Sequence, residues 1–495
     1  MDKKKKNRKK NTQDLHKDDV TVVDTKLAKK SVIATAIGNA MEWFDFGIYS
    51  YLAVILGALF FPEFSGPLQL VFSFATFAVA FLVRPFGGLF FGMLGDRIGR
   101  KKILAITLII MAFATLSIGL IPTYSSIGIT APILLLVARL IQGFSAGGEY
   151  SGAMTFIAES TADKKRGFLS SGLEVGTLVG YITGAGIVTL LTFVLGSETM
   201  HDWGWRIPFF IAAPIGIIGF YLRSNLEETP AFETRNAEEE EDKKQKASLK
   251  NIFVYHRKSL LIGLGLVSFY NTVYYVILTY MPSHLNAVLG YGDTKGLLLI
   301  LVVMVIMIPF VLTAGYFSDR IGNKRIILFG ISGMIVLSIP SFLLIGSGNS
   351  LLVFLGLMIL GALLASFQGV MPSLLPSLFF TEVRYGSLAI TYNVATSVFG
   401  GTAPLVVSWL ISATASRLVP AYYIMFASII GILIVAFFVV ETSGKSLRGQ
   451  PPAVEEKHEI NDVLEDPEEA LWWKEEKSEI AERKEDDSQD DDHEN

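Results

Sequence analysis

The sequence is dominated by long apolar segments, and about 20 mostly apolar residues in an α-helix are enough to cross the hydrocarbon core of a bilayer. Over the 495 residues, 51% are hydrophobic, only 18% are charged and none is cysteine, which excludes disordered, disulfide-scaffold and ordinary soluble classes. Twelve such segments lie near residues 31–60, 68–94, 103–121, 131–158, 168–194, 205–222, 259–282, 296–317, 326–345, 351–378, 387–411 and 420–440. We therefore predict an all-α polytopic membrane protein with 12 transmembrane helices.

The connections between these segments differ in positive charge. The even-numbered connections carry Arg97, Arg100, Lys101, Lys102, Lys164, Lys165, Arg166, Arg320, Lys324, Arg325 and Arg384. The odd-numbered connections carry little beyond Lys295 and Arg417. Because basic connections stay on the cytoplasmic side, both termini are predicted to be cytoplasmic. The first apolar segment is too long for a cleaved signal peptide and is expected to be retained.

An internal repeat divides the chain into two halves. The stretch from Gly92 to Lys102 (GMLGDRIGRKK) returns as Gly315 to Arg325 (GYFSDRIGNKR), at a constant offset of 223 residues. Two copies of a six-helix unit are typical of transporters, with the substrate site between the halves at mid-depth. The predicted organisation is a basic N-terminal tail (1–30), a six-helix bundle (31–222), a central cytoplasmic loop (223–258), a second six-helix bundle (259–440) and an acidic cytoplasmic tail (441–495).

The C-terminal tail has a charge of its own. From Glu441 onward there are 20 acidic and 7 basic residues, net −13, so that residues 1–440 carry +9 within the total of −4. Its isolated apolar positions, such as Leu471, Trp472 and Trp473, keep no heptad spacing, which argues against a coiled coil. We expect a solvated tail, with a regulatory or lipid-facing role for these apolar positions as the alternative.

Ionisable residues inside the apolar segments gather in the first half. Glu42 and Asp45 lie on one face of the first helix, Arg84 in the second helix, and Arg139 and Glu149 in the fourth. A charge at the bilayer centre costs about 2.5 kcal/mol or more, so each of these residues is a candidate functional group. The network either holds the bundle together or couples transport to protons. We expect Glu42 and Asp45 to be proton-linked, since two acids three residues apart repel each other. For Glu149 and Arg84 both interpretations stay open.

Glu174, in the fifth helix, is expected to lie shallower and to be structural. In the second half the polar residues at depth are instead aromatic or amide, among them Tyr270, Tyr274 and Asn393. Aromatic clusters in helices often serve packing alone. Together with Trp43 of the first helix, these tyrosines could instead form a box around an alkylated ammonium group.

The repeated motif is expected to act in gating at the cytoplasmic side. A carboxylate there can meet the positive N-terminus of a neighbouring helix or a basic partner, and such contacts can latch one state of a rocking bundle. The candidate gating residues are Asp96, Arg97, Arg100, Glu159, Arg166, Asp319 and Arg320. Glu159 and Arg166 are the expected partners of the motif in the first half.

The doubled motif and the stretch from Arg139 to Gly143 (RLIQG) resemble signatures of the major facilitator superfamily. More narrowly, four motifs are similar to those of the metabolite:proton symporter family: GNAMEWFDF from Gly38, QGFSAGGEY from Gln142, WRIPF from Trp205 and LEETP from Leu226. The resemblance runs from about residue 29 to 442. It implies a transporter of the bacterial plasma membrane, driven by the proton gradient without a cofactor.

The arrangement of charges favours a zwitterionic substrate such as proline or glycine betaine. Such a molecule needs one cation, Arg84 or Arg139, and aromatic faces or a carboxylate for its ammonium end. The candidate substrate-binding residues are Trp43, Arg84, Arg139, Gln142, Tyr270, Tyr274 and Asn393. The alternative is the same mechanism with a carboxylate such as 2-oxoglutarate, citrate or shikimate, which would need at least two cations.

Other classes fit the sequence less well. A phosphate-loop reading of Gly444-Lys445-Ser446 fails, because Val439 occupies the place of the first required glycine. An enzyme and a metal site are therefore not expected, and a transporter-like sensor remains an alternative. The basic run from Lys3 to Lys10 is expected to meet anionic lipid headgroups rather than nucleic acid.

Overall fold

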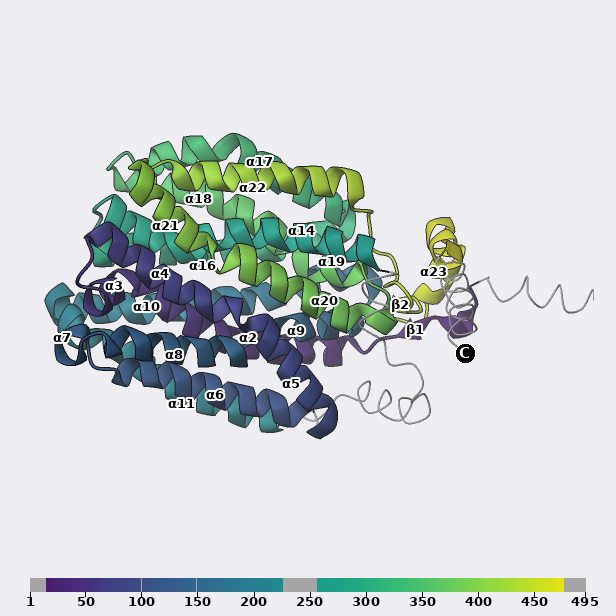
Figure 1. Ribbon diagram of the computed structural model, residues 1–495. Coiled ribbons are helices and arrows are strands. Elements are labelled where there is room, and N and C mark those ends of the chain that lie inside the picture. The colour runs from purple at the N-terminus through teal and green to yellow at the C-terminus, as the bar shows by residue number, and fades with distance from the viewer. Residues whose placement is uncertain (1–14, 99, 148, 226–255, 476–495) are drawn as a thin grey trace, which may run out of the picture.

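The computed structural model describes residues 15–98, 100–147, 149–225 and 256–475, and it consists of two helical bundles that pack side by side (Figure 1). The helices of the first bundle are α2 (Thr25–Tyr51), α3 (Ala53–Phe60), α4 (Gly66–Leu82), α5 (Arg84–Ile98), α6 (Arg100–Leu120), α7 (Tyr124–Ile127), α8 (Thr130–Ser145), α9 (Glu149–Glu159), α10 (Arg166–Asp202) and α11 (Ile207–Asn225). Short 3₁₀ turns are η1 (Lys17–Asp19), η2 (Asp163–Lys165) and η3 (Gly204–Arg206).

The second bundle repeats this plan. Its helices are α14 (Arg257–Tyr274), α15 (Met281–Ser283), α16 (Asp293–Ile321), α17 (Asn323–Ile345), α18 (Ser350–Gln368), α19 (Met371–Ser377), α20 (Thr381–Ala395), α21 (Ala403–Thr414) and α22 (Val419–Phe438). Three π-helical segments interrupt them: η4 (Tyr275–Tyr280), η5 (His284–Val288) and η6 (Thr396–Gly400). Such π segments are rare in general and frequent at functional sites.

The helices form twelve membrane-spanning segments in the predicted order. Among the described residues, nine apolar helices are long enough to span a bilayer, and the pair α2 and α3 adds a tenth span bent by 57°. Two shorter apolar helices, Ile106–Leu120 and Gly204–Ile218, lie at the places of the two other predicted spans. Several spans are broken where proline prevents a continuous helix, as at Arg84-Pro85 between α4 and α5. The first helix begins at Thr25, earlier than the predicted residue 31, because the Asp24 side chain accepts the Lys26 amide and starts the helix there.

The two halves meet along a few helices. Between the bundles, α10 packs on α16, α4 on α21 and α9 on α20, whereas α6, α8 and α11 on one side and α17, α18 and α22 on the other lie further out (Figure 1). Within the first bundle, Gly143 of α8 sits directly against the backbone of Ala80, and Gly87 of α5 against the backbone of Phe144. A side chain at either glycine would force these helices apart, so both glycines permit the close packing.

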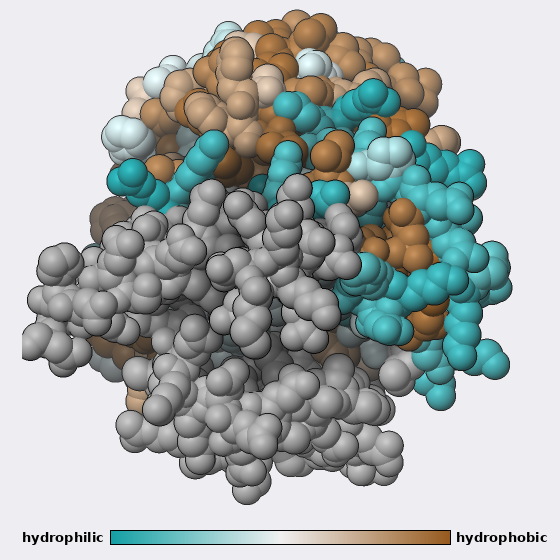
Figure 2. All heavy atoms as spheres, turned by 90° about the vertical axis from the view of Figure 1, so that its right-hand side faces the viewer, coloured by the Kyte–Doolittle hydropathy of each residue, from teal (hydrophilic) through white to brown (hydrophobic). Residues whose placement is uncertain are grey.

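Both chain-terminal segments lie at one end of the bundles, here called the terminal end (right in Figure 1). Strand β1 (Thr21–Val22) pairs in parallel with β2 (Ala453–Val454), and the short helix α23 (Glu459–Glu465) follows. Figure 2 looks onto this end, where hydrophilic side chains gather beside the apolar flanks of the bundles.

The expectation of a solvated C-terminal tail is therefore wrong for residues 441–475. The Glu441 carboxylate accepts the backbone N–H groups of Asn323 and Lys324 at the start of α17, and the Trp472 indole donates to the Ser446 carbonyl at 3.2 Å. Trp472 and Trp473 are both buried. The sequence pattern is too irregular to predict this docking, because it depends on partners far away in the chain.

Candidate functional site

A buried ion pair lies at the centre of the first bundle. Glu42 comes from the middle of α2, and Arg84 is the first residue of α5, where the break before Pro85 turns the chain. Their side chains form a salt bridge and are each only 2% exposed. In a low-dielectric surrounding such a pair interacts far more strongly than in water. The sequence predicts both residues as candidates, and the structure brings them together.

The guanidinium of Arg84 has further partners and two free donors. It donates to the Ala146 carbonyl at 3.2 Å, and its Cζ lies 5.1 Å from the ring centroids of both Phe46 and Phe81. Its Nε and Nη1 groups are buried without a hydrogen-bond partner among the described residues. An unpaired buried donor costs free energy, so these groups are suited to donate hydrogen bonds to a ligand carboxylate.

Asp45 and Arg139 belong to a second, separate network. The Asp45 carboxylate accepts the Thr115 hydroxyl at 3.0 Å, this hydroxyl accepts the Gln142 amide at 2.9 Å, and Arg139 donates to the oxygen of Gln142. Arg139 thus reaches Asp45 through two neutral side chains rather than directly. Its Cζ also lies 4.2 Å from the ring centroid of Tyr49, which encloses it within the first bundle.

Glu149 lies close enough to Arg84 for the two charges to interact. It is half-buried at the start of α9, and its carboxylate accepts the Thr107 hydroxyl of α6 at 3.0 Å. The sequence groups Glu149 with Glu42 and Asp45 as proton-linked. In the structure its hydrogen bond goes to Thr107 of α6, so its role in proton coupling stays a prediction.

An aromatic box borders the ion pair: Trp43, Tyr150, Tyr181, Tyr274 and Tyr275, all buried. The ring centroid of Trp43 lies 5.5 Å from that of Tyr181, 5.6 Å from Tyr274, 6.0 Å from Tyr275 and 6.4 Å from Tyr150. Three of the five come from the first bundle and two from the second, so the box spans the interface. The hydroxyl groups of Tyr274 and Tyr275 are buried without a partner among the described residues.

The sequence predicts Trp43 and Tyr274 as parts of an aromatic wall, and the structure places them in contact. Tyr270 lies one turn before Tyr274, with ring centroids 5.7 Å apart. Asn393 of α20 is buried and reaches the other side of the interface, near Gly88 of α5. Tyr274 and Asn393 of the second half therefore both lie against residues of the first half.

Several buried residues of this region are not among the predicted site residues: Tyr150, Glu174, Tyr181, Tyr275 and Gln368. Glu174 of α10 is fully buried and accepts the Tyr150 hydroxyl and, at 2.9 Å, the amide of Gln368 from α18. The shallow position and structural role of Glu174 stay predictions, because burial inside the bundles does not measure depth along the membrane normal. The face of α10 that carries Glu174 turns toward the second bundle, which a count of residues from the helix start does not show.

The terminal end carries a second set of contacts between the halves. Asp319 of α16 accepts the backbone N–H groups of Gly167 and Phe168, at 2.6 and 2.8 Å, and so caps the start of α10. Glu159 of α9 pairs with Arg384 of α20 at 2.7 Å. These residues therefore reach across the two bundles rather than within the first half.

Two other predicted gating residues have local or tail partners. Arg166 pairs with Asp163 and donates to the Lys445 carbonyl of the tail at 2.9 Å, whereas Arg320 lies 4.3 Å over the ring of Tyr316. The side chains of the remaining candidates, Asp96, Arg97 and Arg100, lie outside the described part of the structure. Arg384, absent from the predicted gating set, is fully buried and also donates to the Arg448 carbonyl at 2.8 Å.

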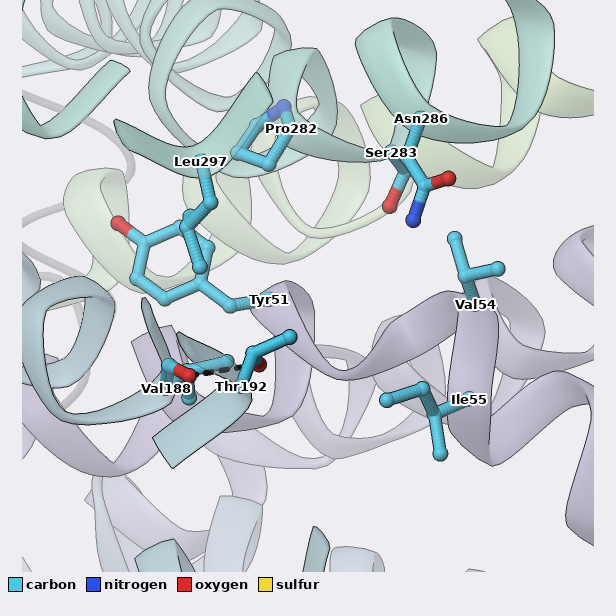
Figure 3. Close-up of a pocket in the computed structure, with 9 residues that line it drawn as sticks. All are labelled: Tyr51, Val54, Ile55, Val188, Thr192, Pro282, Ser283, Asn286 and Leu297. Atoms are coloured by element: carbon cyan, nitrogen blue, oxygen red, sulfur yellow. Dashed lines mark hydrogen bonds between the residues drawn. The ribbon is translucent and has the colours of Figure 1, made fainter. Parts of the chain in front are cut away.

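At the opposite end of the bundles, a small pocket lies between the halves (Figure 3). It is lined by Tyr51, Val54, Ile55, Val188 and Thr192 of the first bundle and by Pro282, Ser283, Asn286 and Leu297 of the second. Deeper along the same interface, the Tyr181 and Thr279 hydroxyls bond at 3.1 Å. Contacts thus join the halves on both sides of the aromatic box. Among the described residues no group of His, Asp or Glu has the arrangement of a metal site.

Comparison with known proteins gives a consistent set of relatives. The Major Facilitator Superfamily model matches residues 35–404. The "Putative proline/betaine transporter" of Staphylococcus aureus (strain COL) is 45% identical over 465 residues, which cover 94% of this chain and 99% of the relative. The "Proline/betaine transporter" of Escherichia coli (strain K12) is 46% identical over 452 residues, 90% of each chain.

Solved structures share the fold at low sequence identity. The crystal structure of a D-xylose-proton symporter has a TM-score of 0.66 and 20% identity, covering 84% of this chain and 99% of that chain. A partially occluded inward open conformation of the xylose transporter XylE from E. coli also has a TM-score of 0.66, at 21% identity, covering 85% and 99%.

Proposed function

Because this chain belongs to the major facilitator superfamily, we propose that it is a proton-coupled symporter that takes up small zwitterions, such as proline and glycine betaine, by alternating access. Its relatives carry proline and betaine in their names, over nearly the full length of this chain. The observation that carries the proposal is the buried Glu42–Arg84 pair beside an aromatic box that spans both halves.

A zwitterion fits these groups at both of its ends. The free Nε and Nη1 groups of Arg84 can receive the carboxylate, and charge-assisted bonds of this kind are short and strong. The ammonium end can rest against the faces of Trp43 and the neighbouring tyrosines, which attract a cation through the ring quadrupole. A di- or tricarboxylate needs a second cation. Arg139 donates to Gln142 and its Cζ lies 4.2 Å from the ring centroid of Tyr49, and its Nε and Nη2 groups are likewise buried without a hydrogen-bond partner among the described residues, so the competition test below decides between the two substrate classes.

Proton coupling follows from competition for Arg84. When a substrate carboxylate binds the guanidinium, Glu42 loses part of its partner's charge and gains affinity for a proton. The proton held on Glu42 and the zwitterion then cross together, and Glu42 releases the proton on the other side, so each cycle moves a net charge of +1. Asp45 and Glu149 are further proton-linked candidates, with Arg139 and Gln142 joining Asp45 to the cationic part of the network.

Alternating access would open the two ends in turn. Opening the terminal end requires release of the Asp319 cap on α10 and of the Glu159–Arg384 pair, and we propose that Arg166, Arg320 and the motif residues Asp96, Arg97 and Arg100 take part in this gate. We assign the terminal end to the cytoplasm of a bacterial cell, with the protein in the plasma membrane, on the basis of its basic connections. The only driving force required is the proton gradient, and no cofactor takes part.

Uptake by purified protein in liposomes tests the proposal. Radiolabelled proline and glycine betaine should accumulate when the outside is acidic, and a protonophore should abolish the accumulation. For one proton per substrate, one pH unit sustains about a tenfold concentration ratio. Stronger competition by citrate, 2-oxoglutarate or shikimate than by proline would identify a carboxylate carrier instead. Binding without counterflow would identify a sensor.

A further inference from the structure

Glu174 joins the two bundles through neutral partners. One carboxylate oxygen accepts the Tyr150 hydroxyl of the first bundle, and the other accepts the Gln368 amide of the second bundle at 2.9 Å. Tyr270 lies beside the same carboxylate. No Lys or Arg side chain lies within 4 Å of Glu174 among the described residues, in contrast to Glu42. A carboxylate has about four acceptor positions, so Glu174 keeps capacity for further donors.

Gln368 adds an acceptor at the same place. The Gln368 Nε2 group donates to Glu174, so the Gln368 Oε1 atom points away from that carboxylate. This oxygen is buried without a hydrogen-bond partner among the described residues. Gln368 itself is fully buried. A buried unpaired acceptor costs free energy and is rare in folded proteins, which points to a donor that arrives with a ligand.

Ring contacts connect these acceptors with the Arg84 guanidinium. Tyr150 donates to Glu174 and its ring contacts Trp43, the neighbour of Glu42 in the chain. On the other side, Tyr275 contacts both Trp43 and Phe81, and Phe81 carries the Arg84 guanidinium over its ring. The Glu174 and Gln368 acceptors and the Arg84 donors thus border the same cluster of aromatic rings, which contains Trp43 and Tyr275.

We propose that Glu174 and Gln368 accept the N–H groups of the substrate's ammonium, and so decide between zwitterions that carry N–H bonds and fully methylated ones. The proposal rests on the proposed function, since it places the carboxylate of the same substrate at Arg84. Aromatic faces attract both kinds of cation and discriminate little between them. Hydrogen bonds do discriminate, because a substrate without N–H cannot donate to the Gln368 oxygen, which has no other partner among the described residues.

The matched substrates are proline, N-methylproline and N,N-dimethylproline, which share one ring and differ in having two, one or no N–H bonds on the ammonium nitrogen. Each competes with radiolabelled glycine betaine for uptake into proteoliposomes. The variants are Gln368→Met, which keeps the side-chain length but removes the acceptor, and Glu174→Gln, which removes the charge. Gln69→Met, at a half-buried glutamine of α4 whose side chain donates to the Phe64 carbonyl, is the control substitution.

In Gln368→Met we expect the half-inhibitory concentration of proline to rise about tenfold or more, with a smaller rise for N-methylproline. That of N,N-dimethylproline should stay within about twofold. Glu174→Gln should change the ratio of the half-inhibitory concentrations of proline and N,N-dimethylproline in the same direction. Gln69→Met should leave this ratio unchanged. Equal shifts for all three substrates, or no shift, would overturn the assignment.

The experiment also covers an inactive variant and an inactive unsubstituted protein. If a variant transports nothing, the purified variant is instead tested for protection against thermal unfolding by proline and by N,N-dimethylproline. The ratio of the protecting concentrations of these two ligands must then change in the same direction. If the unsubstituted protein accumulates none of these substrates, the proposed function fails, and this result is seen before any variant is made.

Discussion

Glu42→Gln should destabilise the protein much more than Asp45→Asn, although both substitutions neutralise a buried acid on the same face of α2. Glu42 pairs directly with Arg84, and removing one member of a buried pair costs about 3–5 kcal/mol. The new glutamine keeps a neutral acceptor toward the guanidinium, worth about 1 kcal/mol. The expected loss in the free energy of unfolding is therefore about 2–4 kcal/mol.

Asp45 has a different environment. Its carboxylate accepts a neutral hydroxyl from Thr115, and no cation lies within 4 Å of it among the described residues. An asparagine can accept the same bond through its side-chain oxygen. We expect Asp45→Asn to change the free energy of unfolding by no more than about 1 kcal/mol.

Unfolding of the purified variants in detergent at neutral pH measures this difference, and transport in liposomes measures the coupling. If Glu42 carries the proton, Glu42→Gln should still exchange labelled for unlabelled substrate, while accumulation under a gradient of one pH unit falls from about tenfold to none. A larger loss of stability in Asp45→Asn would refute the pairing argument. Normal accumulation by both variants would refute their role in proton coupling.

Three further predictions concern packing, gating and the tail. Gly143→Ala places a methyl group against the backbone of the adjacent helix and should cost about 2 kcal/mol or more in thermal unfolding, whereas Gly66→Ala, with open space around it, should be nearly neutral. Asp319→Asn weakens a helix cap that joins the two halves, and so should favour opening of the terminal end. A single cysteine introduced between the two bundles of this cysteine-free chain should then react about fivefold faster with a maleimide added from the terminal end. Glu441→Gln, which weakens a cap within the second half, should not change that reaction rate. Burial raises the pKa of the Glu469 carboxyl in the docked tail, so docking of the tail is favoured below that pKa and weakens as the pH rises through it. Hydrogen exchange of residues 459–473 should therefore become faster with pH by more than the intrinsic increase of the exchange rate. This additional acceleration should be smaller in Glu469→Gln.

Much of the fold follows from local properties of the sequence. The length and apolar character of each segment, the alternation of basic connections and the repeat at offset 223 predict twelve helices in two halves, in agreement with the structure and the relatives. These features depend on near neighbours in the chain, because a helix that crosses lipid must be apolar along its own length. The same reasoning identifies Glu42, Asp45, Arg84 and Arg139 as the buried charges.

The tertiary structure alone decided how those charges combine. In a helix, one residue turns the side-chain direction by about 100°, so the crossing and rotation of each helix select its partners. This selection pairs Glu42 with Arg84, separates Asp45 from Arg139 by two neutral side chains, and brings Glu174 to Gln368 of the other bundle. Partners so distant in sequence leave no local pattern, because only the packed arrangement of the helices makes them neighbours.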